Sequence, residues 1–238
     1  MRAALLLFAA TLLSAQTFEV ASVKVNDSGS GSSSAPWLAK GRLTATNTSM
    51  RQMLQSAWGL SSPQIVGPSW IDTDRYDIEA KSPEGTADTE IKPMLQALLK
   101  ERFHLEAHLE TREQPVYDLV VMKDGAKIKP TDLNHPFTQP PRMPGACCMM
   151  VAYRGKLDEF ALGISGTVGR PVVNKTGLEG PYAWALQYAR LDSATSAPTS
   201  APDIYAAIQQ QLGLKLESAK AAVPTLIVDH AEHVPTGN

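Results

Sequence analysis

Hydrophobic residues recur along the chain at the spacing of amphipathic helices, and each such stretch is followed by extended runs. The first stripe places five apolar residues on one helical face: Met50, Met53, Leu54, Ala57 and Trp58. Asn47, Thr48 and Ser49 are available as caps before this stripe, and Gly59 follows it. The pattern therefore predicts a helix that ends at Gly59.

A second helix is predicted from an apolar stripe that contains a proline. The stripe consists of Ile91, Leu95, Leu98 and Leu99. Pro93 fits only the first turn of a helix, so we expect the helix to begin near residues 89 to 91. Two extended runs follow, FHLEAHLE at 103–110 and PVYDLVVMK at 115–123, and the first alternates apolar and polar residues as a strand does.

Two further helices are predicted in the second half of the chain. The stripe of the third consists of Leu157, Phe160, Ala161 and Ile164. After it come PVVN and YAWALQY, which we expect to form a hairpin through KTGLEG. The fourth helix follows a capping box of Ser200 and Asp203 and stops at Gly213, before the extended runs LKLES and TLIVDH.

This order of elements predicts an α+β fold made of repeated helix-strand-strand units, with mostly antiparallel sheets and helices on one face. TFEVASVKV at 17–25 predicts an additional strand at the N-terminal side. Prolines crowd the middle of the chain, at Pro130, Pro136, Pro140, Pro141 and Pro144. We therefore expect a linker at 131–149 between an N-terminal subdomain, 16–130, and a C-terminal subdomain, 150–238.

The first fifteen residues have the layout of a secretory signal peptide. Arg2 precedes an apolar run that is too short to span a bilayer, and the small residues Ser14 and Ala15 close it. A buried N-terminal helix is the alternative interpretation. We predict cleavage near Ala15 and export to the periplasm or beyond, with no membrane insertion afterwards because no later run approaches ~20 apolar residues.

Charge and glycine patterns exclude some classes of ligand. The net charge is -2 with both signs interspersed, so we expect no nucleic-acid partner. In GRPVVNKTGLEG the predicted order is helix, strand and loop, the reverse of a phosphate-binding glycine loop, so Lys175 is interpreted as a solvated turn residue. GISGT at 163–167 lacks the second glycine of a nucleophile elbow.

Two histidine clusters invite a metal interpretation. In HLEAH, His104 and His108 would lie about 13 Å apart on a strand at ~3.3 Å per residue, too far to bind one ion together. An exposed polar strand face is therefore expected. For DHAEH at 229–233 we expect no more than weak, adventitious metal binding. Asp72, Asp74 and Asp77 crowd the first predicted hairpin, and spacing alone does not show whether they converge.

RMPGACCMM at 142–150 holds the most unusual chemistry of the chain, with Cys147, Cys148, Met149, Met150 and Met143 close in sequence. Soft sulfur ligands select Cu(I), whereas apolar packing at the entry to a buried strand is the favoured alternative. The two cysteines could be reduced, form a strained bridge between adjacent residues, or bond to another chain.

Several long motifs resemble a known family. They are FEVASVK at 18–24, GPSWIDTDRYDIEAK at 67–81, MLQALLKERFHLEAHLETREQPVYDLVV at 94–121, GRPVVNKTGLEG at 169–180 and QQQLGLKLES at 209–218. Together they resemble soil-associated exported proteins of uncharacterised function, a domain also found attached to membrane metallopeptidases akin to β-lactam sensors. The predicted units are loosely similar to the short docking domains of secretins and TonB-dependent receptors. The resemblance implies no catalytic residue, and the chain has no H-E-x-x-H motif.

We therefore expect an exported, noncatalytic module that binds an envelope protein or glycan, without a cofactor. The alternative is a metal-handling protein, with Cys147, Cys148 and Met149 or His104 and His108 as ligands, or a hydrolase with an unrecognised site. The ligand, the biological process and the oligomeric state are open at this point.

Overall fold

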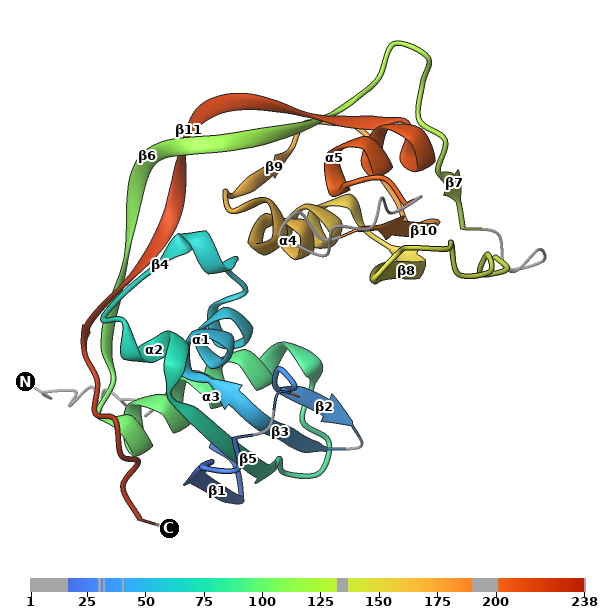
Figure 1. Cartoon of the computed structure of the whole chain (residues 1–238). Coiled ribbons are helices and arrows are strands. Elements are labelled where there is room, and N and C mark those ends of the chain that lie inside the picture. The colour runs from blue at the N-terminus through green and yellow to red at the C-terminus, as the bar shows by residue number, and fades with distance from the viewer. Residues whose placement is uncertain are drawn as a thin grey trace, which may run out of the picture. The chain divides into compact units, whose positions relative to one another are not determined.

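A computed structural model (Figure 1) describes residues 17–29, 31, 33–39, 41–131, 137–189 and 201–237. The predicted signal peptide, residues 1–15, and the predicted cap Ser200 lie outside these residues. Helices combine with mostly antiparallel sheets, so the predicted α+β class is confirmed. Among the described residues, no helix is both long and apolar enough to cross a bilayer.

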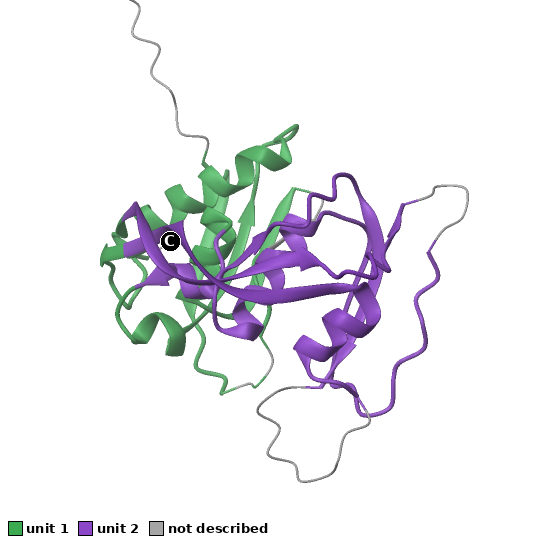
Figure 2. Ribbon diagram, turned by 90° about the horizontal axis from the view of Figure 1, so that it is seen from above, with its two compact units in different colours: residues 1–59, 67–107, 228–238 green, residues 60–66, 108–227 purple. Residues whose placement is uncertain are grey.

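The chain divides into two compact units, each made of separate stretches of sequence (Figure 2). Unit 1 comprises residues 1–59, 67–107 and 228–238, and unit 2 comprises residues 60–66 and 108–227. The predicted linker at 131–149 falls inside the sequence of unit 2. These units therefore do not coincide with the predicted subdomains 16–130 and 150–238, whose separate folding stays a prediction.

Unit 1 contains an antiparallel sheet with the strand order β1-β5-β3-β2. Its strands are β1 (Val20–Val25), β2 (Trp37–Ala39), β3 (Arg42–Ser49) and β5 (Arg75–Lys81), so the predicted N-terminal strand is confirmed. The ladder between β3 and β5 is irregular between Ala45 and Thr48, where Asn47 has a φ of 51°. Asp77 holds this bulge, because its carboxylate accepts hydrogen bonds from Asn47 N (2.8 Å) and Asn26 Nδ2 (2.7 Å).

Helices α1 (Met50–Trp58), α2 (Trp70–Thr73) and α3 (Asp88–Phe103) complete unit 1. Ser49 and Gln52 form a capping box at the start of α1, and Gly59 ends it with a φ of 67°, as predicted. Helix α3 begins one residue before the predicted window. Pro93 therefore lies in the second turn, where its missing N–H costs one helical hydrogen bond.

Two long strands have residues in both units: β6 (Glu106–Val121) and β11 (Leu214–His230), which are neighbours in the sheet β4-β11-β6-β9. We predicted two separate runs in each place, but each strand is continuous through a proline, Pro115 in β6 and Pro224 in β11. The short edge strands β4 (Ile65–Val66) and β9 (Val172–Asn174) pair only beyond these prolines. The missing proline N–H groups therefore fall outside the stretches of β6 and β11 that pair with the edge strands.

Unit 2 also contains an antiparallel sheet with the order β7-β10-β8, formed by β7 (Lys129–Pro130), β8 (Cys148–Gly155) and β10 (Tyr182–Tyr188). Helices α4 (Leu157–Val168) and α5 (Ile204–Ala207) and a π-helical segment, η2 (Ile208–Leu212), pack with β10 in one core. Large side chains alternate along β10 and join this core: Tyr182, Trp184, Leu186 and Tyr188. Asp203 caps α5 by accepting a hydrogen bond from Ala206 N (2.8 Å).

The predicted hairpin at 171–188 is wrong. Strand β9 pairs with β6 in parallel, whereas β10 pairs with β7 and β8, so KTGLEG connects two different sheets. The Ser165 hydroxyl accepts a hydrogen bond from Val172 N (2.9 Å), and Lys175 N donates to the Leu119 carbonyl (2.9 Å). These contacts direct the segment toward β6. Helix α4 is followed by two strands, whereas α2 lies between the two strands that follow α1, and α3 and η2 each lead directly into one long strand.

Candidate functional site

The two predicted histidine clusters meet in unit 1, at the end of α3. We predicted that His104 lies in a strand, and this is wrong. The residue ends α3 in a left-handed conformation with a φ of 46°. Its Nδ1 lies 3.1 Å from a carboxylate oxygen of Glu232, which comes from DHAEH. His108 lies in β6 and is exposed. Within the described parts of the chain, no group of three or more His, Cys, Asp or Glu residues is arranged to hold a metal ion.

His233, from the same DHAEH motif, docks the C-terminal segment onto unit 1. Its ring stacks on Trp70 with a centroid distance of 4.1 Å, and its Nδ1 lies 2.8 Å from Asp74 Oδ2. The Tyr76 hydroxyl donates to the His233 carbonyl (2.7 Å). Burial raises the pKa of the Tyr76 phenol far above its ordinary value, so this donor stays protonated.

The acidic residues of the first predicted hairpin have structural partners. Asp72 pairs with Arg51, Asp74 with His233, and Asp77 holds the bulge of β3. The three carboxylates therefore stabilise local structure of unit 1, each with a different partner.

The cysteine and methionine cluster is divided between several environments in unit 2. Neither cysteine is in a disulfide, and the Sγ atoms of Cys147 and Cys148 lie 2.9 Å apart. Cys148 and Met150 pack against the main core of the unit, whereas Met143 packs against a small alanine cluster. Met149 Sδ lies 3.7 Å from Gln139 Nε2. Packing thus accounts for much of the motif, and the Cu(I) interpretation stays a prediction.

The loop KTGLEG borders a hollow of about 310 Å³ at the start of α4. Asp158 and Glu159 occupy the first turn of this helix, and Asn174 Nδ2 donates to Asp158 Oδ1 (3.0 Å). A glycine-containing loop beside a helix N-terminus is the arrangement of a phosphate site, which the order of elements in the sequence argued against. Here the carboxylates of Asp158 and Glu159 already place negative charge at the helix N-terminus, which disfavours a bound phosphate.

A second hollow lies between the β7-β10-β8 sheet and the proline-rich segment 137–144, and both contribute to its lining. Gln187 of β10 fixes this segment, because its amide donates to the Pro141 carbonyl (3.0 Å) and accepts from Met143 N (2.6 Å). Gln187 is only 4% exposed. The described part of the predicted linker is therefore attached to the sheet.

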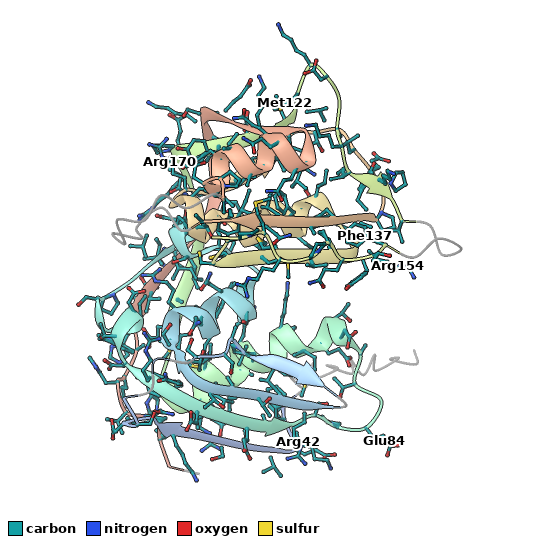
Figure 3. All side chains as sticks on the ribbon, turned by 45° about the vertical axis from the view of Figure 1, so that its right-hand side comes forward. Arg42, Glu84, Met122, Phe137, Arg154 and Arg170 are labelled. Carbon is teal, nitrogen blue, oxygen red and sulfur yellow. The ribbon has the colours of Figure 1, made fainter. Side chains whose placement is uncertain are left out.

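Aromatic and polar contacts at β8 hold the start of the same segment. Phe137 and Tyr153 pack edge to face, with ring centroids 6.0 Å apart, and the Tyr153 hydroxyl donates to Gln139 Oε1 (3.4 Å). Figure 3 shows Phe137 near the end of β8 that carries Arg154. The segment is thus attached to β8 through Tyr153 and to β10 through Gln187.

The hollow itself, which we call the β10 hollow, has a volume of about 310 Å³. Its lining comes from the β7 region, the proline-rich segment, β10 and the end of η2: Lys127, Ile128, Lys129, Phe137, Thr138, Pro140, Ala183, Trp184, Ala185, Gln211 and Leu212. Ala183 and Ala185 alternate with the large core residues of β10, and their small side chains leave the space open. The described lining includes two lysines and no carboxylate.

The hydrogen-bond ladder of β10 is interrupted at the β10 hollow. The Pro181 carbonyl accepts from Thr131 N (2.9 Å), and Ala183 pairs with Lys129. Farther along, the Gln211 side chain accepts from Gln187 N (2.9 Å) and donates to the Gln187 carbonyl (2.7 Å). Between these positions the β7 side leaves the ladder, because Lys127 N donates to the Leu212 carbonyl instead (2.8 Å).

Ala185 lies at this interruption. Alternate residues of a strand direct their N–H and C=O groups to the same neighbour, so Ala185 directs its groups to the same side as Ala183 and Gln187. Among the described residues, none bonds to Ala185 on that side. Ala185 is also the one partly exposed residue of β10, whose other six residues are buried. The site thus combines an available backbone donor and acceptor with two lysines.

Comparison with known proteins decides the family. The model of a family described as "Protein of unknown function (DUF3738)" matches residues 22–231. The chain belongs to the DUF3738 family. Searches of curated proteins and of solved structures gave no significant match. Membership agrees with the expected uncharacterised family, and the match covers both units of the structure.

Sequence reasoning missed the β10 hollow in this DUF3738 protein. The alternation of large and small residues in YAWALQY was a signal for a strand with one open face. It did not show that a proline-rich segment 40 residues earlier in the chain would cover that face only in part. The interrupted ladder depends on the Gln187 and Gln211 amides, which no periodicity reveals.

Proposed function

We propose that this protein is an exported, noncatalytic module that binds a partner in the cell envelope through the β10 hollow. The interrupted ladder at Ala185 carries the proposal, because an unpaired strand position beside a hollow offers main-chain hydrogen bonds to a partner. The volume of about 310 Å³ is at the lower end of the range for ligand sites. A protein segment fits these features better than a glycan, because it supplies matching backbone groups.

Export is supported by the pattern of residues 1–15 and by the resemblance to exported proteins associated with soil bacteria. The resemblance to a domain attached to membrane metallopeptidases akin to β-lactam sensors also supports a role at the envelope. The test is the intact mass of the secreted protein. A mature chain that begins just after Ala15 supports export, and a chain that still begins at Met1 contradicts it.

Photo-crosslinking in the cells that produce the protein tests the binding function. A benzophenone amino acid is placed at Thr138, on the lining of the β10 hollow, and at exposed Glu84 in unit 1 as the control (Figure 3). We expect one reproducible protein adduct from position 138 and none of that mass from position 84. Identical adducts from both positions, or none from either, contradict the proposal.

A second candidate function is soft-metal handling by the adjacent cysteines. It is favoured by the 2.9 Å separation of the two Sγ atoms and by the exposure of Cys147. The protein is loaded with Cu(I) under anaerobic conditions and dialysed, and the retained copper is compared with that of a Cys147→Ser, Cys148→Ser variant. Stoichiometric copper in the wild type alone supports this function, and equal retention by both proteins rejects it.

A further inference from the structure

We propose that the β10 hollow binds the C-terminal residue of a partner polypeptide, with its free carboxylate beside Lys129 and its backbone paired with Ala185. This inference rests on the proposed binding function and specifies its ligand. The argument uses the length of the gap in the ladder, the groups that Ala185 offers and the charge of the lining.

The gap in the ladder is too short for a passing strand. On one side the gap ends at the pair of Ala183 and Lys129. On the other side it ends at Gln187, whose backbone N–H and C=O are both bonded to the Gln211 side-chain amide. A segment that continued in both directions along β10 would have to displace one of these partners. A chain end that enters the hollow needs only the one position that is available.

A C-terminal residue matches the two backbone groups of Ala185. Its own N–H can donate to the Ala185 carbonyl, and its carboxylate can accept from Ala185 N–H, which is the exchange that two paired strand residues make. An acidic side chain offers the acceptor alone. Capture of a terminal carboxylate by backbone groups is an established mode of peptide recognition.

The charges around the hollow complement a carboxylate. Lys129 is exposed, and within the described chain no ion pair engages it. Lys127 Nζ donates to the Gln210 carbonyl (2.8 Å), and its remaining protons are available to another acceptor. The described lining holds these two lysines and no carboxylate, so its charge attracts an incoming anion.

The apolar part of the lining sets the preferred last side chain. Ala183 and Ala185 form one wall, and Ile128, Phe137 and Pro140 contribute the rest of the apolar surface. A cavity of about 310 Å³ accommodates a residue of modest size together with its carboxylate. We therefore expect a small or medium aliphatic last residue, such as alanine or valine.

The test is a titration of the ¹⁵N-labelled full chain with N-acetyl-Ala-Ala-Val as the free acid and as the C-terminal amide, followed by NMR. The free acid should shift the Ala185 amide resonance in a saturable way. The amide should bind at least about ten-fold more weakly, because it lacks the charge-assisted hydrogen bonds. Equal affinity of the two peptides overturns the inference.

Two substitutions separate the charge from the shape of the site. Lys129→Ala should weaken binding of the free acid several-fold and reduce its salt dependence, whereas Lys123→Ala, at an exposed position outside the lining, should change neither. Ala185→Leu keeps both lysines and should abolish binding by filling the hollow. Unchanged affinity in Lys129→Ala or in a folded Ala185→Leu variant contradicts the inference.

The outcomes also distinguish this inference from the proposed function. If neither peptide binds but position 138 still gives a specific protein adduct, the binding function stands and the terminal-carboxylate ligand is rejected. If the peptides fail to bind and position 138 gives no adduct, both are rejected. Saturable binding of the free acid alone supports both.

Discussion

Gln187→Ala should release the proline-rich segment from the sheet of unit 2. The substitution removes the hydrogen bonds to the Pro141 carbonyl (3.0 Å) and from Met143 N (2.6 Å), while the bonds between the Gln187 backbone and Gln211 remain. The Pro141 and Met143 positions are not buried, so water can replace part of what is lost. The released segment also contributes Phe137, Thr138 and Pro140 to the lining of the β10 hollow.

The size of the effect follows from the groups that lose their partners. A net hydrogen bond contributes ~1 kcal/mol, so the two bonds together contribute about 2 kcal/mol. Loss of the buried methylene of a side chain that is only 4% exposed adds ~0.8 kcal/mol. We expect the free energy of unfolding to fall by about 2 to 3 kcal/mol.

Urea unfolding and limited proteolysis measure this change at two levels. Trypsin should cleave after Arg142 more than about ten-fold faster in the variant, because cleavage of a native protein reports the population of the locally opened state. In the wild type the Arg142 side chain is held by the Ala146 carbonyl (3.3 Å) and the Cys147 carbonyl (2.7 Å). The matched control is Gln209→Ala, an exposed glutamine of η2.

The control should stay within about 0.5 kcal/mol of the wild type and show the same cleavage rate. The reasoning is refuted if Gln187→Ala loses less than ~0.5 kcal/mol and its cleavage rate after Arg142 matches that of the control. That result would mean that contacts other than the Gln187 amide hold the segment.

Three other predictions concern the two units separately. Gly155→Ala should lower the melting temperature of unit 2, by a loss of ~1 to 3 kcal/mol, since a Cβ there would collide with the Trp184 ring, and an unchanged melting temperature contradicts this. His233→Ala should change the Trp70 fluorescence and lose ~1 kcal/mol, since the exposed ring stacks on the indole; an unchanged emission spectrum would count against that stacking in solution. Burial raises the pKa of Tyr205 to about 12, which favours the neutral phenol in the folded state. The stability that Tyr205 contributes should therefore be complete below pH ~10 and be lost as the pH rises toward 12. Ultraviolet titrations of the wild type and of Tyr205→Phe measure this. If the wild type shows no additional phenol that titrates late, the prediction is contradicted.

Local patterns predicted the helices well, because caps and apolar periodicity act within a few residues. Helix α1 begins after Ser49 and ends at Gly59 as expected, and the apolar stripe of α4 is buried. Partners of strands were harder to predict. Pro115 and Pro224 suggested breaks in the strands, but a proline interrupts a ladder only where a neighbour needs its N–H.

The candidate site was hidden from sequence reasoning for a similar reason. Nothing in the spacing of Gln187 and Gln211 indicates that one side chain would cap the backbone of the other. His104 was assigned to the HLEAH cluster and Glu232 to DHAEH. The fold brings the imidazole of His104 next to the carboxylate of Glu232, 128 residues later in the sequence. Contacts of this kind arise from tertiary packing, which a periodic pattern does not encode.

The interleaved sequence of the two units fixes the order in which their residues become available during synthesis. Unit 1 uses residues from the start of the described chain, yet it also needs 228–237, where the His233 ring and the Thr236 N–H make their contacts. All of unit 2 precedes those residues in the chain. A ribosome that releases the chain from its N-terminal end therefore delivers every part of unit 2 before unit 1 is complete. The unit whose residues emerge first is therefore completed last, because Trp70 and Tyr76 gain their contacts with His233 only when the final residues are released.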